Sequence, residues 1–197
     1  YDFHLIYHAL NNFCAVDLSA FYFDVLKDRI YIAFPGDRNR MAGMTTMHEI
    51  LDTLLRLMAP ILSFTAEEVY RCTPMIHGES IHLADFPNTV AERRDLGLEE
   101  KWEPLLLVRG EVLKALEEAR QGQEGKGSSL NYQVRLFAGG GLFEKLSPFV
   151  DEMAEVFIVS GALLAAEGEK FPNGVFRSEE IDGLSIEVGE AAGQKCA

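Results

Sequence analysis

The spacing of apolar residues is the feature that most constrains how this chain can fold, because it changes along the sequence. Up to residue 72, apolar side chains recur every three or four positions, as they do on one face of an amphipathic helix. From Tyr132 onward, the segments 132–136 and 184–188 alternate apolar and polar residues, a pattern typical of half-buried strands. The sequence therefore predicts a mainly α-helical protein with a small α+β part after the helices.

Four helical patterns follow one another in the first part of the chain. They cover residues 3–13, 18–26, 44–58 and 65–72. Asp17 is placed to cap the second helix, because a short acceptor side chain can satisfy a free N–H of the first turn. Thr65 and Glu68 have the spacing of a capping box at the start of the fourth helix. Short connections favour antiparallel neighbours, so we expect an antiparallel helical bundle.

A connector and a second set of elements follow the bundle. Residues 75–100 combine Gly, Pro and scattered charge, and a fifth helical pattern runs from Trp102 to Leu116. Further elements are expected as short helices at 142–146 and 151–155 and as a buried strand over the apolar run 156–159. We expect a helical domain with its connector over residues 1–103 and an α+β subdomain over residues 104–192.

The charge balance bears on the choice of partner. Lysine and arginine number 18 against 31 aspartates and glutamates, so the formal net charge is −13. This acidity argues against nucleic acid as a default partner, because binding phosphates needs Lys and Arg. The charge is uneven, however, and the first part carries a small basic cluster of Arg29, Arg38 and Arg40. A negative net charge does not exclude a locally basic face.

No arrangement of catalytic residues stands out. His4 and His8 have the i, i+4 spacing that can hold zinc, but no third ligand is near, so a structural role is favoured. Cys14 and Cys72 fall within apolar helical patterns and are expected in the core. Three widely spaced cysteines predict no disulfide framework and fit a reducing cytoplasm. The sequence has no run of 18 apolar residues, so a membrane partner is not expected.

Two segments resemble a known family. Residues 12–31, NFCAVDLSAFYFDVLKDRIY, resemble a segment of isoleucyl-tRNA synthetases, and residues 57–70, LMAPILSFTAEEVY, resemble the segment that follows it there. Residues 80–87 and 127–130 continue the likeness in the same order. The chain departs from the family at Tyr70, where Trp is frequent, and at Asn131-Tyr132, where Glu-Ala is usual.

The resemblance implies the anticodon-binding helical domain of a class I aminoacyl-tRNA synthetase, followed by its C-terminal α+β region. The complete enzyme of this family attaches isoleucine to its tRNA with ATP and Mg²⁺. The family's catalytic signatures, His-Ile-Gly-His and Lys-Met-Ser-Lys-Ser, are absent from this sequence. We therefore expect this chain alone to be inactive, to hold no cofactor, and to work with the remaining synthetase domains of the same polypeptide.

The resemblance also implies the start of a zinc-binding region over residues 193–197. Cys196 would be the first ligand of that cysteine cluster. Because the sequence ends at Ala197, we expect no zinc to be held by this chain.

The expected partner is the anticodon stem-loop of isoleucine tRNA. Unstacked loop bases are held by aromatic or Arg planes, and phosphates by cationic side chains. The candidate contacts are Arg29, Arg38, Arg40 and Arg71, with Tyr70 as a weaker stacking residue. The alternative for each arginine is a solvated surface charge, and for Tyr70 a place in the core. Two other functions stay open: a helical protein–protein docking module without RNA binding, and a metal-binding regulator that uses His4 and His8.

Overall fold

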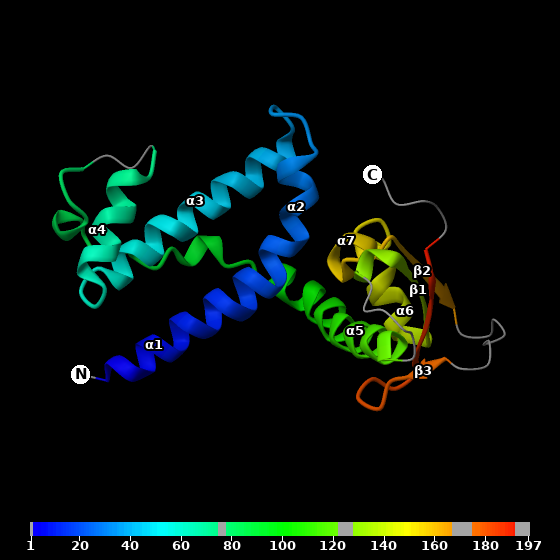
Figure 1. Ribbon diagram of the computed structural model, residues 1–197. Helices are drawn as coiled ribbons and strands as arrows, with labels where there is room; N and C mark the ends of the chain where they lie inside the picture. The colour runs from blue at the N-terminus through cyan, green and yellow to red at the C-terminus, as the bar shows by residue number, and fades with distance from the viewer. Residues whose placement is uncertain (1, 75–77, 122–127, 167–174, 192–197) are drawn as a thin grey trace. The chain divides into compact units, whose positions relative to one another are not determined.

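The computed structural model describes residues 2–74, 78–121, 128–166 and 175–191, and the chain divides into two compact units (Figure 1). The first unit is Tyr1–Arg94 and the second is Asp95–Ala197. The prediction of a mainly helical protein with a small α+β part is confirmed. The sequence places the division after residue 103, whereas the units divide after Arg94, ahead of a long helix that belongs wholly to the second unit.

The first unit is built from helices. They are α1 (Phe3–Asn12), η1 (Phe13–Tyr22), α2 (Phe23–Tyr31), α3 (Arg38–Met58), α4 (Ser63–Cys72) and the single turns η2 (Ile81–Leu83) and η3 (Ala91–Arg93). The antiparallel arrangement of these helices stays a prediction.

The predicted cap at Asp17 is wrong, because the chain stays helical through that position. Residues 3–31 form one helical run whose middle third, η1, is a π-helix with i→i+5 hydrogen bonds. A capping side chain is needed only where N–H groups lack partners in a preceding turn. The core placement of Cys14 is also wrong, since its side chain is exposed on η1.

The predicted capping box at Thr65 and Glu68 is wrong as well. Helix α4 begins at Ser63, and the apolar Leu62 occupies the N-cap position. The N–H of Ala66 donates to the carbonyl of Leu62 at 2.9 Å, so the backbone is already helical at Thr65. At the other end of this helix, Cys72 is exposed rather than buried, contrary to prediction.

Helix α3 packs against α2, α4 and η2 within the first unit. Leu55 in its C-terminal half and Ala59 just after its end belong to a buried cluster. The other buried members are Ala66 and Tyr70 of α4 and Ile81 of η2. Near its other end, Leu26 of α2 lies over the buried Gly43, where a Cβ atom would stand 3.2 Å from the Leu26 methyl carbon Cδ2. The missing side chain at Gly43 therefore lets α2 and α3 approach closely.

Glu67 ties the connector to α4. Its Oε2 accepts hydrogen bonds from the Ser80 hydroxyl at 2.8 Å and the Ile81 N–H at 3.0 Å, while Oε1 accepts from Arg71 Nε at 2.7 Å. The hydrogen bond from Ser80, supported by those from Ile81 and Arg71, lowers the pKa of the Glu67 carboxyl. Ile81 is thereby held where it can enter the buried cluster.

The second unit combines one long helix with a small sheet. Its elements are α5 (Leu96–Gln121), η4 (Ser129–Asn131), β1 (Tyr132–Ala138), α6 (Gly140–Leu146), η5 (Ser147–Phe149), α7 (Met153–Phe157), β2 (Gly161–Ala166), β3 (Phe176–Arg177) and β4 (Leu184–Glu190). The described strands form one sheet in the order β2-β1-β4-β3. Strand β1 is parallel to β2 and antiparallel to β4.

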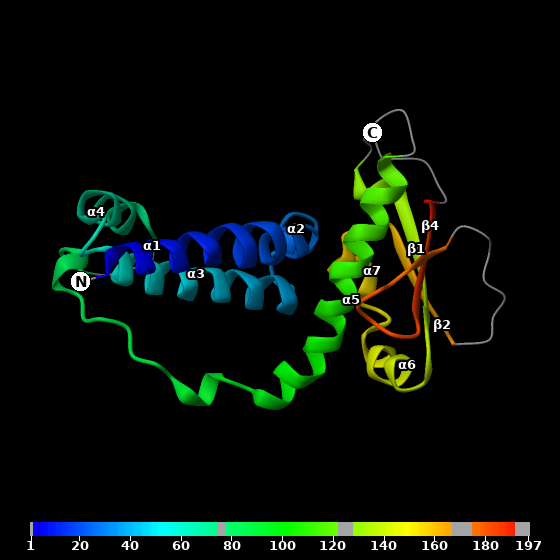
Figure 2. The same ribbon diagram turned by 90° about the horizontal axis from the view of Figure 1, so that it is seen from below.

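One face of this sheet is covered by α5, α6 and α7, as Figure 2 shows. The alternation in β1 explains the arrangement, because Val134 and Leu136 are buried while Gln133 and Arg135 between them are exposed. Both strands predicted from alternation, 132–136 and 184–188, are confirmed.

The strand predicted at residues 156–159 is wrong. Val156 and Phe157 end the short helix α7, Ile158 adopts a left-handed conformation with φ 58°, and the strand begins at Gly161. Both Val156 and Phe157 are buried, and a short apolar run does not distinguish a buried helical turn from a buried strand. The fifth helix likewise starts at Leu96 rather than near Trp102, because Asp95 caps it by accepting from the Leu98 N–H at 3.0 Å.

A buried carboxylate joins α5 to the segment before β4. Glu111 is 3% exposed and accepts a hydrogen bond from Lys114 Nζ at 2.7 Å, and the same ammonium group donates to Glu180 at 2.6 Å. Hydrogen bonds from Lys114 and then Ser178 lower the pKa of Glu111. The Ser178 hydroxyl in turn accepts from the Ile181 N–H at 2.8 Å.

We predict that Glu67→Gln lowers the melting temperature of the protein at pH 7, because Gln carries no charge to hold Ser80, Ile81 and Arg71. A carboxyl whose pKa is lower in the folded state stabilises the fold above its unfolded pKa, and that contribution is lost as the pH falls through the folded pKa. The difference in melting temperature should therefore shrink below about pH 4. Thermal unfolding followed by circular dichroism measures it, with the exposed neighbour Glu68→Gln as control. A difference that grows in acid would contradict the prediction.

We predict that Lys114→Met lowers the urea midpoint of the second unit, because it leaves the buried Glu111 carboxylate without its ammonium partner. Lys101→Met is the matched control, since Lys101 lies exposed on the same helix. Fluorescence of Trp102, the single tryptophan of the chain, reports the unfolding of this unit. Equal midpoints for the two variants would show that the network adds nothing to stability.

Candidate nucleic-acid interface

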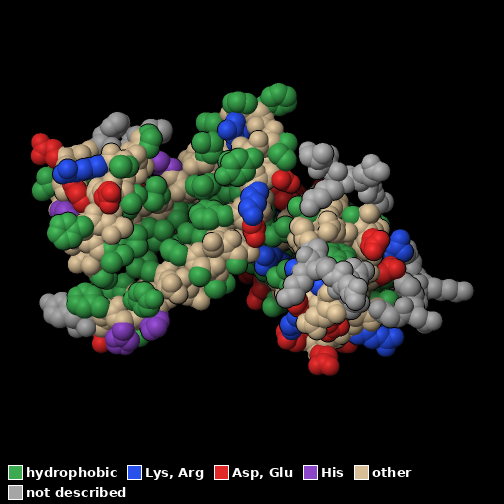
Figure 3. Space-filling view, viewed as in Figure 1, with side chains coloured by type: hydrophobic (Ala, Val, Ile, Leu, Met, Phe, Trp, Pro, Cys, Tyr) green, Lys and Arg blue, Asp and Glu red, His purple; other side chains and the backbone are tan. Residues whose placement is uncertain are grey.

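Three of the predicted arginines lie at one end of the first unit, where α2 passes into α3. Arg29 is in the last turn of α2, and Arg38 and Arg40 are in the first turn of α3. We call residues 29–40 the α2–α3 corner. It is the end of the first unit at which the loop between α2 and α3 stands out in Figure 1, and Figure 3 shows basic and hydrophobic side chains side by side there.

The corner is held by backbone hydrogen bonds. The Ile32 N–H donates to the Asp28 carbonyl at 3.0 Å, and the Asp37 N–H donates to the Phe34 carbonyl at 2.9 Å. The second bond closes a four-residue turn with Pro35 in its second position, which suits the restricted φ of proline. The Asp37 carboxylate then accepts from the Arg40 N–H at 2.9 Å and caps α3.

The three arginines differ in how free their guanidinium groups are. Arg38 is exposed, and among the described residues no hydrogen bond or ion pair engages its side chain. Arg40 is half-buried, and its Nε atom is buried without a hydrogen-bond partner among the same residues. Arg29 is half-buried and interacts within the protein. Arg38 is therefore the cation of the corner that is placed to meet an external anion.

Other cations of the first unit are held by carboxylates of the same unit. Arg56 donates to Asp52 at 2.9 Å and to the Asp85 carbonyl at 3.2 Å. Arg93 makes a two-pronged contact with Glu49, at 2.7 and 3.4 Å. These pairs fix the connector against α3 and neutralise the charge of the arginines involved.

The remaining two predicted contact residues lie elsewhere. Arg71 is in the last turn of α4, where Glu67 holds it, and α4 lies at the other end of α3 from the corner (Figure 1). Tyr70 is 5% exposed and belongs to the buried cluster of α3 and α4. Its position favours a place in the core over stacking on an RNA base. The structure thus brings Arg29, Arg38 and Arg40 together and does not bring Tyr70 and Arg71 to them.

Sequence reasoning missed the aromatic residues of the corner. Tyr31 is 84% exposed and Phe34 is 85% exposed, with Ile32 at 77% between them. A signal was present, because the segment Ile30–Phe34 is almost wholly apolar although it leads directly into a Pro-Gly turn. Residues that lead into a turn lie at the surface of a domain, where few neighbours can bury them. An apolar run at such a place therefore indicates exposed apolar surface.

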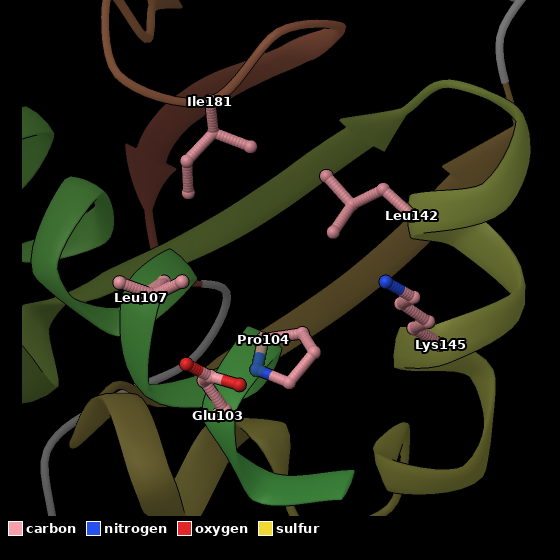
Figure 4. A pocket seen from close by; sticks show the side chains of 6 residues that line it. All are labelled: Glu103, Pro104, Leu107, Leu142, Lys145 and Ile181. Carbon is pink, nitrogen blue, oxygen red and sulfur yellow. The ribbon is translucent and has the colours of Figure 1, made fainter. Parts of the chain in front are cut away.

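Hollows lined by described residues also lie away from the corner. An apolar groove of about 440 Å³ runs between α1 and α3, with the Glu49–Arg93 pair in its lining. In the second unit, a smaller hollow of about 250 Å³ lies between α5 and α6, and Figure 4 shows the side chains around it. Its lining is Glu103, Pro104, Leu107, Leu142, Lys145 and Ile181.

Metal binding by histidine finds no support in the part of the chain that the structure describes. His4 and His8 are both exposed on α1. Within the described ranges, no group of three His, Cys, Asp or Glu side chains could hold a metal ion. Cys196 lies outside the described residues, so its role as a zinc ligand stays a prediction.

None of the described helices is both long enough and apolar enough to cross a bilayer.

Comparison with known proteins decides the family. The family model of the anticodon-binding domain of tRNA ligase matches residues 1–133, which include the whole first unit and the α2–α3 corner. The chain belongs to this family. The match extends through α5 and stops at the start of β1, so most of the sheet lies beyond it.

Individual relatives agree with this assignment. An isoleucine–tRNA ligase of Moorella thermoacetica is 43% identical over the whole of this chain, and one of Natranaerobius thermophilus is 44% identical. A third, from Geobacter sulfurreducens, is 42% identical. The resemblance to isoleucyl-tRNA synthetases is therefore confirmed. The chain covers 21% of each of these three ligases, so it spans about a fifth of the length of the curated relatives it matches.

Proposed function

We propose that this chain is the tRNA-recognition portion of an isoleucine–tRNA ligase, and that its first unit binds the anticodon stem-loop of isoleucine tRNA. The observation that carries the proposal is the family match over residues 1–133 together with the free guanidinium of Arg38 inside the matched region. An anticodon-binding domain needs cations that are not already neutralised by neighbouring carboxylates, because phosphate contacts supply most of the affinity for RNA.

The corner offers such cations in an otherwise acidic chain. Arg38 and Arg40 stand two residues apart at the start of α3, and the turn before them is closed by its own hydrogen bond. Their backbone is therefore ordered before RNA arrives, which lowers the entropic cost of binding. Arg29 completes the local positive charge from the last turn of α2.

The ligation of isoleucine belongs, in this proposal, to the complete ligase with ATP and Mg²⁺. This chain contributes binding and orientation of the tRNA. Zinc belongs to the complete enzyme too, with Cys196 as one ligand. Because the described residues offer no group of three metal ligands, no step assigned to them runs through a metal ion.

The remaining domains of the ligase are proposed as partners in the same polypeptide. All residues of α1, Phe3–Asn12, are described, and none of them is buried although the helix is rich in apolar side chains. Such an apolar surface is normally covered by protein. This observation also favours the second candidate function, a docking module that binds a separate protein and no RNA.

A cytoplasmic location is part of the same proposal. Cys14 and Cys72 are exposed free thiols. A reducing compartment preserves such groups, whereas an oxidising one favours their pairing or modification.

Binding titrations of the chain with isoleucine tRNA and with an anticodon-swapped tRNA, each at several salt concentrations, test the function. We expect tighter binding of the isoleucine tRNA and weaker binding of both as salt rises. Equal affinity for the two tRNAs would show that the chain contacts the RNA backbone and does not recognise the anticodon bases. Absence of binding at low salt would contradict the proposal and favour the docking module.

The role of the corner has its own prediction. Arg38→Ala should reduce the slope of log affinity against log salt by about 0.7 to 0.9, the value for one lost phosphate contact. Arg71→Ala is the matched control, because Arg71 is already paired with Glu67 at 2.7 Å, and it should leave the slope unchanged. Equal effects of the two substitutions would show that general charge, and not the corner, determines RNA affinity.

A further inference from the structure

The corner exposes far more apolar surface than a turn between two helices needs. Tyr31, Ile32 and Phe34 each show more than three quarters of their surface to solvent, and Arg38 follows Phe34 after three residues. The α2–α3 corner thus combines exposed aromatic rings with a guanidinium that has no partner among the described residues.

The rings are attached to an ordered backbone. Tyr31 is the last residue of α2, and Phe34 is the first residue of the turn that the Asp37–Phe34 hydrogen bond closes at 2.9 Å. The packing of Leu26 over Gly43 holds α2 against α3 just behind the corner. A ligand that stacks on these rings therefore meets a main chain that is already in place, and only the side chains need to be ordered.

The surrounding charges restrict what that ligand can be. The exposed Arg38 attracts an anionic backbone. The Asp37 carboxylate accepts the N–H of Arg40, and the Lys27 ammonium is paired with Asp24. Unpaired nucleotides combine an anionic phosphate with a flat, stackable base, and they match this set of groups. A paired RNA helix matches it poorly, because its bases are stacked on one another and hidden.

We propose that the α2–α3 corner is a stacking platform for unpaired nucleotides of the bound RNA, with bases on Tyr31 and Phe34 and a phosphate at Arg38. This inference rests on the proposed tRNA-binding function and goes beyond it. It assigns base contact to two aromatic residues, and it specifies single-stranded loop nucleotides as what the corner holds.

The test separates ring stacking from general apolar contact. Tyr31→Leu and Phe34→Leu together keep apolar side chains at the corner but remove both π-faces, whereas Tyr31→Phe and Phe34→Tyr keep them. The matched control is Phe64→Leu, since Phe64 is 92% exposed on α4, at the other end of α3. The probes are an RNA hairpin with the anticodon loop of isoleucine tRNA and a duplex of the same stem without unpaired nucleotides.

We expect the double leucine variant to bind the hairpin roughly tenfold more weakly, a loss typical of removing base–aromatic stacking. The ring-preserving double variant and Phe64→Leu should bind it as the unmodified chain does. A loop base replaced by 2-aminopurine, whose fluorescence falls on stacking, should be quenched by the unmodified chain and not by the leucine variant. Binding of the duplex should be equal for all four proteins.

Three outcomes would overturn the platform. Unchanged hairpin binding by the leucine variant, with Arg38→Ala still weakening it, would leave tRNA binding in place and assign the aromatic surface to a protein partner. Equal losses for hairpin and duplex would show contact with the RNA backbone alone. Failure of the unmodified chain to bind either probe at low salt would overturn the tRNA-binding function itself and the platform with it.

Discussion

The close approach of α2 and α3 at Leu26 and Gly43 is the contact on which the arrangement of the first unit depends. A Cβ atom at position 43 would stand 3.2 Å from the Leu26 side chain, closer than nine in ten real contacts of this kind. Without a side chain there, the helices meet directly, and the residues between them must form a short, tight connection. The Phe34–Asp37 turn and the Asp37 cap supply that connection. Arginines and aromatic rings are thereby gathered at one end of the unit.

Pairing of charges within the fold explains how an acidic chain can offer a basic contact surface. Arg56, Arg71 and Arg93 are each held by a carboxylate of the first unit, so they stabilise the connector and α4 instead of adding to an external field. Arg38 is left out of these pairs because it starts α3, next to an exposed turn. The net charge of −13 is therefore a poor guide to the local surface at the corner.

The second unit depends on a different kind of contact. Glu111 lies buried on α5, and its hydrogen bonds with Lys114 and Ser178 attach the helix to the segment that leads into β4. The buried carboxylate is tolerated there because Lys114 supplies an opposite charge and both Lys114 and Ser178 donate hydrogen bonds to it. Apolar residues of α5 then cover one face of the sheet, as their regular burial along the helix shows.

Periodicity determined that the first unit is helical and that β1 and β4 are strands, because these features depend on short-range spacing. The resemblance to a synthetase family came instead from two local segments, residues 12–31 and 57–70. The sequence also placed Arg29, Arg38 and Arg40 near one another, since fewer than a dozen residues separate them. It did not establish that Tyr70 is buried while Tyr31 and Phe34 are exposed, because the burial of an aromatic ring depends on what another helix covers. Nor could it show that Glu67 neutralises Arg71 while Arg38 stays free. Those differences arise from tertiary packing, which alone decides which apolar and charged groups find partners.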